Sequence, residues 1–210
     1  MFTLYAILLS LAVSVFCDDE EFSVETYPNP RKGQYRECGL RSPGNVCDPY
    51  ETLSESERYR INTQLTNFVT KTEENGNTFC AKKGTDAMFV ITAQGTQDFA
   101  DGLRRRWTTI DSQCGRFGVL VLSLENRRIY GSFDERSPVQ TTQLQAIIAT
   151  EEAHIQTGSY TTAVTNILKE VAASVAPAGA TTTAHPESTT KSAISQLTMV
   201  SLILSLIYFL

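Results

Sequence analysis

The sequence predicts an α/β fold in which a small mixed sheet has helices on both faces and is stabilised by disulfides. Two short, continuously apolar runs, residues 87–92 and 119–124, are typical of strands that are buried on both faces. Segments with helical periodicity precede, separate and follow these runs. The order helix, strand, helix, strand, strand, helix, helix therefore indicates an α/β sandwich whose first two strands are joined by a right-handed helical crossover.

The first predicted helix covers residues 55–73. Ser54 and Glu57 have the spacing of a capping box, in which each side chain binds a free backbone N–H at the helix start. Apolar residues then recur at helical spacing, at Ile61, Leu65, Phe68 and Val69. The turn sequence at 75–77 ends this helix and leads to the first buried strand.

The second predicted helix separates the two buried strands, and Phe99, Leu103 and Trp107 share one of its faces. After the second strand, a turn leads into residues 128–133, where apolar and polar residues alternate. This alternation predicts a hairpin partner at the edge of the sheet. Two helices, 141–153 and 161–175, follow and are separated by a short polar loop.

The N-terminus resembles a secretory signal. Residues 2–16 form an apolar run of suitable length, and Val15 and Cys17 are small enough for cleavage after Cys17. The run lacks a preceding basic residue, but acidic residues 18–21 follow it at once. We expect residues 1–17 to be removed and the mature domain to be extracellular.

The C-terminus predicts attachment to a membrane. Residues 194–210 carry no charge and follow a Thr- and Pro-rich stalk, residues 176–193. Their apolar core is shorter than the about 20 residues of a spanning helix and lacks a basic flank. We therefore expect a glycosylphosphatidylinositol signal, with Gly179 and Ser188 as lipid-anchor candidates, and a location on the outer leaflet of the plasma membrane. A single-pass helix is the alternative.

Between these ends we expect an N-terminal extracellular segment, residues 18–53, and one α/β domain, residues 54–175. Four cysteines remain after removal of the signal, an even number that indicates two disulfides in an oxidising compartment. Three pairings are formally open. Cys38 and Cys47 bracket a Gly- and Pro-rich loop, and Cys80 and Cys114 each precede a buried strand, so we favour these two pairs. Zinc is the weaker alternative, because no CxxC motif occurs.

The net charge of −5 argues against nucleic acid as a partner. The basic cluster Arg104, Arg105 and Arg106 and the loop 39–46 are the candidate partner contacts, since exposed loops and charges on a rigid scaffold often carry function. A solvated helix face is the simpler interpretation of the arginines.

Two groups of motifs resemble known families. The segment 114–129, CGRFGVLVLSLENRRI, together with GSYTTA at 158–163, resembles the TPM domain. Residues 27–31, YPNPR, the pair Cys38-Gly39 and VCDP at 46–49 resemble the extracellular nematode branch of that group, the modulator of levamisole receptor-1 family.

The resemblance implies a TPM-like fold and an auxiliary protein that enhances gating of a levamisole-type nicotinic acetylcholine receptor from outside the cell, at a synapse for example. The founding member is held by a transmembrane helix, whereas this sequence ends in a signal typical of a lipid anchor. A mechanism that acts through the ectodomain remains compatible with that difference.

The resemblance also implies alternatives, because some TPM-domain proteins are phosphatases or bind calcium. Asp98, Asp101 and Asp111 are the carboxylates that could form a cation site, although calcium requires six or more oxygen ligands. His154 lies near a helix end, where an imidazole is more often a packing partner than a base. No GxSxG, HExxH or P-loop motif occurs, so we expect neither an enzyme nor a bound cofactor. A passive surface protein is the third interpretation.

Overall fold

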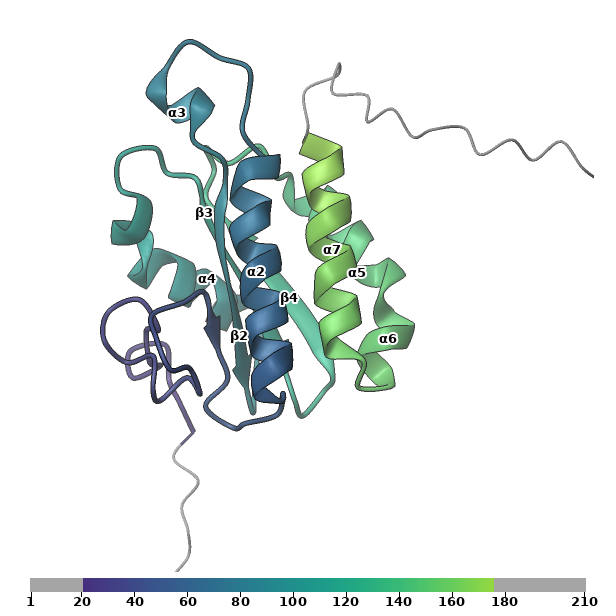
Figure 1. Ribbon diagram of the computed structural model, residues 1–210. Helices are drawn as coiled ribbons and strands as arrows, with labels where there is room; N and C mark the ends of the chain where they lie inside the picture. Colours follow the sequence, from purple (N-terminus) through teal and green to yellow (C-terminus); the bar gives the residue numbers. More distant parts are fainter. Residues whose placement is uncertain (1–20, 176–210) are drawn as a thin grey trace, which may run out of the picture. The chain divides into compact units, whose positions relative to one another are not determined.

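A computed structural model describes residues 21–175 of the chain (Figure 1). The predicted signal at 1–17, the stalk at 176–193 with Gly179 and Ser188, and the anchor signal at 194–210 lie outside the described residues. Within the described part of the chain, no helix has both the length and the apolar character needed to cross a bilayer.

The sheet has four strands in the order β1-β2-β3-β4. β1 is Val46–Cys47, β2 is Asp86–Thr92, β3 is Phe117–Ser123 and β4 is Arg128–Phe133. β1, β2 and β3 are parallel, while β4 pairs with β3 in the antiparallel direction. The predicted small mixed sheet is confirmed, as is the hairpin that places the last strand at its edge.

One face of the sheet is covered by four helices; in Figure 1, α2 and α7 lie in the foreground, with α5 behind α7 and α6 at the right. They are α2 (Glu55–Lys71), α5 (Thr141–Thr150), α6 (Glu152–Gln156) and α7 (Tyr160–Val175). Their buried faces and alternate residues of the strands form one core, which includes Ile61, Leu65, Phe68, Phe89, Leu120, Leu144 and Ile167. Ser54 and Glu57 form the predicted capping box at the start of α2.

The opposite face is covered by α4 (Gln97–Arg106), the short 3₁₀ helix η1 (Thr108–Asp111) and the N-terminal segment. Their core includes Tyr27, Met88, Val90, Leu103, Trp107 and Val121. The Tyr27 hydroxyl donates a 2.6 Å hydrogen bond to the Ile91 carbonyl of β2. Burial raises the pKa of Tyr27 well above its ordinary value. The N-terminal segment is therefore an integral part of this layer.

Two disulfides join Cys38 to Cys47 and Cys80 to Cys114, which is the pairing favoured from the sequence. The first closes the loop that leads into β1. The second links α3 (Phe79–Lys82) to the loop before β3. The parallel pairing of β2 and β3 explains the second bond, because it brings the segments before both strands to the same end of the sheet.

Three local features differ from the sequence prediction. β1 was not predicted, because two residues carry too little pattern and their pairing with β2 depends on the tertiary fold. The short helix α3 was likewise missed. The helix predicted at 141–153 is divided at Glu151, a buried residue that takes a non-helical conformation between α5 and α6.

Candidate functional site

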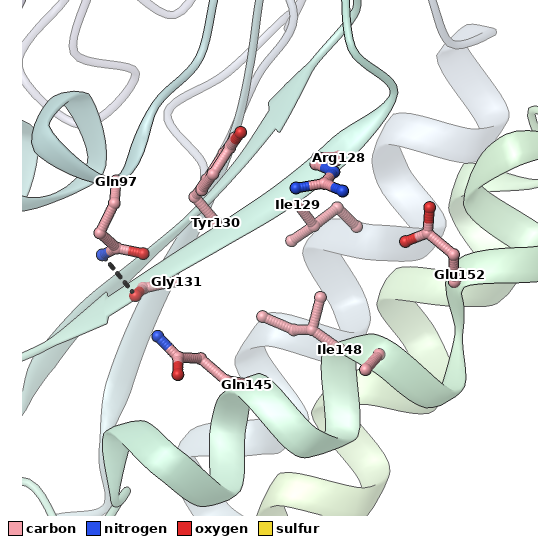
Figure 2. Close-up of a pocket in the computed structure, with 9 residues that line it drawn as sticks. Gln97, Arg128, Ile129, Tyr130, Gly131, Gln145, Ile148 and Glu152 are labelled. Carbon is pink, nitrogen blue, oxygen red and sulfur yellow. Dashed lines mark hydrogen bonds between the residues drawn. The ribbon is translucent and has the colours of Figure 1, made fainter.

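A groove runs along the outer edge of β4, with a volume of about 410 Å³ (Figure 2). Strand β4 forms its floor, Gln97 at the start of α4 lies on one side, and α5 lies on the other. The lining residues are Gln97, Arg128, Ile129, Tyr130, Gly131, Gln145, Ile148, Ala149 and Glu152.

The register of the hairpin determines which backbone groups of β4 point into this groove. The N–H of Asp134 donates a 2.8 Å hydrogen bond to the Phe117 carbonyl, so these two residues form a hydrogen-bonded pair. Such pairs alternate along an antiparallel ladder. Arg128, Tyr130 and Ser132 are therefore the residues bonded to β3. The backbone N–H and C=O groups of Ile129, Gly131 and Phe133 point away from β3, toward the open edge.

Gln97 covers the middle of this edge. Thr96 caps α4 by accepting a hydrogen bond from the Phe99 N–H, which places Gln97 in the first turn beside β4. The Gln97 side-chain amide donates a 3.0 Å hydrogen bond to the Gly131 carbonyl, drawn as a dashed line in Figure 2. A side-chain amide thus occupies the position that the N–H of a neighbouring strand would take.

The wall on the α5 side is close to the strand because residue 131 is a glycine. A Cβ at Gly131 would lie 2.5 Å from Cδ2 of Leu144, so any larger residue would displace the Leu144 side chain of α5. Ile148 and Ala149 line the groove from α5, and Gln145 projects toward it from the same helix (Figure 2). The groove is neutral along its centre and has Arg128 and Glu152 at one end.

The three predicted partner-contact arginines have different environments. Arg104 is half-buried and binds the Asp134 carboxylate at 2.6 Å and the Ser132 hydroxyl at 2.9 Å. Arg106 donates 2.7 Å hydrogen bonds to the carbonyls of Val24 and Tyr27, which hold the N-terminal segment on α4. Arg105 and Arg106 are both exposed. Arg104 and Arg106 nevertheless contact other segments of the fold, whereas the Arg105 side chain makes no hydrogen bond or ion pair with any described residue.

One part of the disulfide loop 39–46 packs against the domain, and another part is exposed. Gly39 lies against the Arg58 side chain, which is buried and pairs with Asp48 at 3.1 Å. Residues 41–43 are exposed, and Arg41 forms a surface ion pair with Glu55. The exposed tip of this loop is available to a partner.

The carboxylates considered for a cation site are not brought together. Asp98 is exposed, Asp101 accepts a hydrogen bond from Ser132, and Asp111 is buried in an ion pair with Lys83 at 2.6 Å. Within residues 21–175, no group of three or more His, Cys, Asp or Glu side chains is arranged to hold a metal ion. His154 lies beside the buried Glu151, with 3.0 Å between Nδ1 and the carboxylate.

The sequence predicted the edge position of β4 but not the groove. The groove also requires α5 to approach Gly131 and α4 to begin beside β4. The angle at which α5 returns to β4 has no local sequence pattern, and the contact of Gln97 with Gly131 joins residues 34 positions apart. A glycine inside an alternating strand was the local signal for close approach of another element.

Comparison with known proteins gives a family and a fold. The family model described as modulator of levamisole receptor-1 matches residues 22–127, about half of the 210-residue chain. No protein of curated function matches the sequence.

Solved structures of three bacterial domains are similar. The N-terminal domain of a P. gingivalis protein has a TM-score of 0.51 at 17% identity, covering 73% of this chain and 90% of that domain. The N-terminal domain of a Corynebacterium glutamicum protein scores 0.45 at 11% identity, covering 63% and 80%. A protein of Bizionia argentinensis scores 0.47 at 8% identity, covering 61% and 84%. The first supports the predicted TPM-like α/β fold, and at such identities the likeness concerns the fold alone.

Proposed function

The chain belongs to the modulator of levamisole receptor-1 family, and we propose from this membership that it is an extracellular auxiliary protein of a levamisole-type nicotinic acetylcholine receptor. In this proposal its α/β domain binds the receptor and increases agonist-evoked current. The family match is the observation that carries the proposal.

The proposed location is the outer leaflet of the plasma membrane at the cell surface, synaptic where the receptor is synaptic. Two disulfides in the domain are typical of a protein that folds in an oxidising compartment. The apolar, uncharged residues 194–210 support a lipid anchor. A tether to the same membrane raises the effective concentration of the domain near the receptor, so a weak contact would be sufficient.

Positive modulation requires a difference in affinity between two receptor states. A protein that binds resting and open receptors equally well shifts no equilibrium, however tightly it binds. A preference of about 1 to 3 kcal/mol for the open state would shift gating by roughly 5- to 150-fold. The rigid, disulfide-linked domain is suited to such selective binding, because little ordering cost accompanies association.

The test is agonist-evoked current from a levamisole-type receptor expressed with and without the full chain, at matched receptor number on the cell surface. A truncated chain that lacks residues 193–210 is the control for tethering. We expect a larger current with the full chain and a smaller effect with the truncated chain. An unchanged current across this receptor class would refute the assignment.

A further inference from the structure

We propose that the open edge of β4 binds an extended, uncharged peptide segment of a partner protein, which pairs with β4 as a fifth strand and places an apolar side chain against α5. This inference goes beyond the family assignment and does not depend on which receptor, if any, the protein modulates.

The two edges of the sheet are protected differently. The β1 edge is only two residues long, and the adjacent Asp48 N–H is bonded to the Cys38 carbonyl beside the disulfide. The β4 edge is six residues long, and no other strand of the described chain pairs with it. A long edge with unpaired backbone groups is a template for another strand, and proteins normally cover or interrupt it.

Side chains, rather than a strand, cover the β4 edge. The Gln97 amide binds the Gly131 carbonyl and imitates a single N–H of a pairing strand. A change of side-chain rotamer would uncover that carbonyl without moving the backbone. The outward groups of Ile129, Gly131 and Phe133 could then form a regular ladder with an incoming segment.

The chemistry of the groove indicates the character of that segment. In strand addition, backbone hydrogen bonds supply affinity, and pockets for alternate side chains supply specificity. Ile129, Ile148 and Ala149 form an apolar wall between β4 and α5, which fits one apolar side chain. At the centre of the groove the amides of Gln97 and Gln145 are neutral, and a charged side chain placed beside them would lose hydration without an adjacent ionic partner, because the charged lining residues Arg128 and Glu152 lie at one end.

A single segment fits this site better than a second copy of the chain. The start of α4 and α5 flank the edge on its two sides, so that once the Gln97 side chain has moved there is room for one strand between the two helices. A second copy would bring its own α5 and Gln97 to the same place. Adjacent strands are about 4.8 Å apart, so the two sets of flanking groups would compete for the same space.

The test uses the full chain in detergent micelles as the target for a phage-displayed library of random peptides, followed by synthesis of the selected peptides. We expect the selected peptides to be uncharged around one apolar residue. Addition of such a peptide should slow amide hydrogen exchange at Ile129, Gly131 and Phe133, and N-methylation of alternate peptide residues should abolish binding.

Two matched arginine variants on α5 test whether the selected peptides bind in the groove or elsewhere on the surface. Ala149→Arg adds a long side chain to the groove wall, while Ala146→Arg makes the same change at an exposed α5 position outside the lining. We expect Ala149→Arg to weaken binding by at least about tenfold, Ala146→Arg to leave it unchanged, and Gln97→Ala to strengthen it.

Four results would overturn the proposal. They are failure to select any peptide, equal binding by both arginine variants, selected peptides that leave the three amides unprotected, and concentration-dependent protection of those amides without peptide. The last would identify a second copy of the chain as the occupant.

Discussion

The guanidinium of Arg104 donates a 2.6 Å hydrogen bond to the carboxylate of Asp134, and this contact joins α4 to the end of β4. Both side chains are mostly buried, with exposed fractions of 21% and 9%. The position of Gln97 over the β4 edge depends on the same packing of α4 against β4. The pair therefore contributes to the shape of the groove as well as to the stability of the domain.

Arg104→Ala should destabilise the fold, because it leaves the Asp134 carboxylate buried and without its cation. We expect a loss of about 2 to 3 kcal/mol in the free energy of unfolding. Arg105→Ala on the same helix should change it by less than about 0.5 kcal/mol, since that side chain is exposed. Urea unfolding of both variants measures the difference, and equal effects would contradict the assigned roles.

Gly131→Ala should destabilise the domain by about 1 to 3 kcal/mol, since its Cβ would overlap Leu144 on α5. Shortening the opposing side chain should relieve the overlap. We therefore expect the double variant Gly131→Ala/Leu144→Val to lose less free energy of unfolding than the two single variants lose in total. Chemical unfolding of the three variants tests this coupling, and strictly additive effects would show that the glycine is not required for close packing of α5.

The sequence identified the central strands well because their signal is local. Residues 87–92 and 119–124 are continuously apolar, and they correspond to β2 (Asp86–Thr92) and β3 (Phe117–Ser123) within two residues at each end. The parallel arrangement of these strands also led to the pairing of Cys80 with Cys114. Periodicity and spacing were sufficient wherever an element is long and its neighbours follow in sequence.

The arginine cluster shows where sequence reasoning was insufficient. Three adjacent arginines on a helix have the same local pattern, but Arg104 binds Asp134 and Arg106 binds the carbonyls of Val24 and Tyr27. These partners lie 30 or more positions away in the chain. The distinction between Arg105 and its neighbours is therefore a property of tertiary packing, as is the groove beside β4.

The Cys80–Cys114 disulfide closes a loop between cysteines 34 positions apart and so restricts the unfolded chain. Its removal should therefore lower the free energy of unfolding by about 4 kcal/mol. The double variant Cys80→Ala/Cys114→Ala tests this without leaving a free thiol. Its free energy of unfolding should be compared with that of the intact chain under non-reducing conditions. An unchanged value would indicate that the bond contributes little to the restriction of the unfolded state.

Asp111 should make stability depend on acid pH. Its side chain is buried, and its carboxylate accepts hydrogen bonds from Lys83 at 2.6 Å and from the backbone N–H groups of Arg116 and Cys114 at 2.8 and 3.3 Å. Burial by itself raises the pKa of Asp111, but these hydrogen bonds outweigh it and hold the pKa below its ordinary value of 3.8.

The direction of the effect follows from that lowered pKa. The unfolded chain takes up the Asp111 proton at a higher pH than the folded chain, so the stabilisation is fully present above about pH 4 and is lost as pH falls through the folded pKa. At neutral pH, Asp111→Asn should cost about 1 to 3 kcal/mol, because it removes the carboxylate that pairs with the partly exposed Lys83 and accepts two backbone hydrogen bonds. The cost should shrink toward pH 2. Urea unfolding across this range measures it, with the exposed Asp98→Asn as control, and a cost independent of pH would disprove the role of the charged carboxylate.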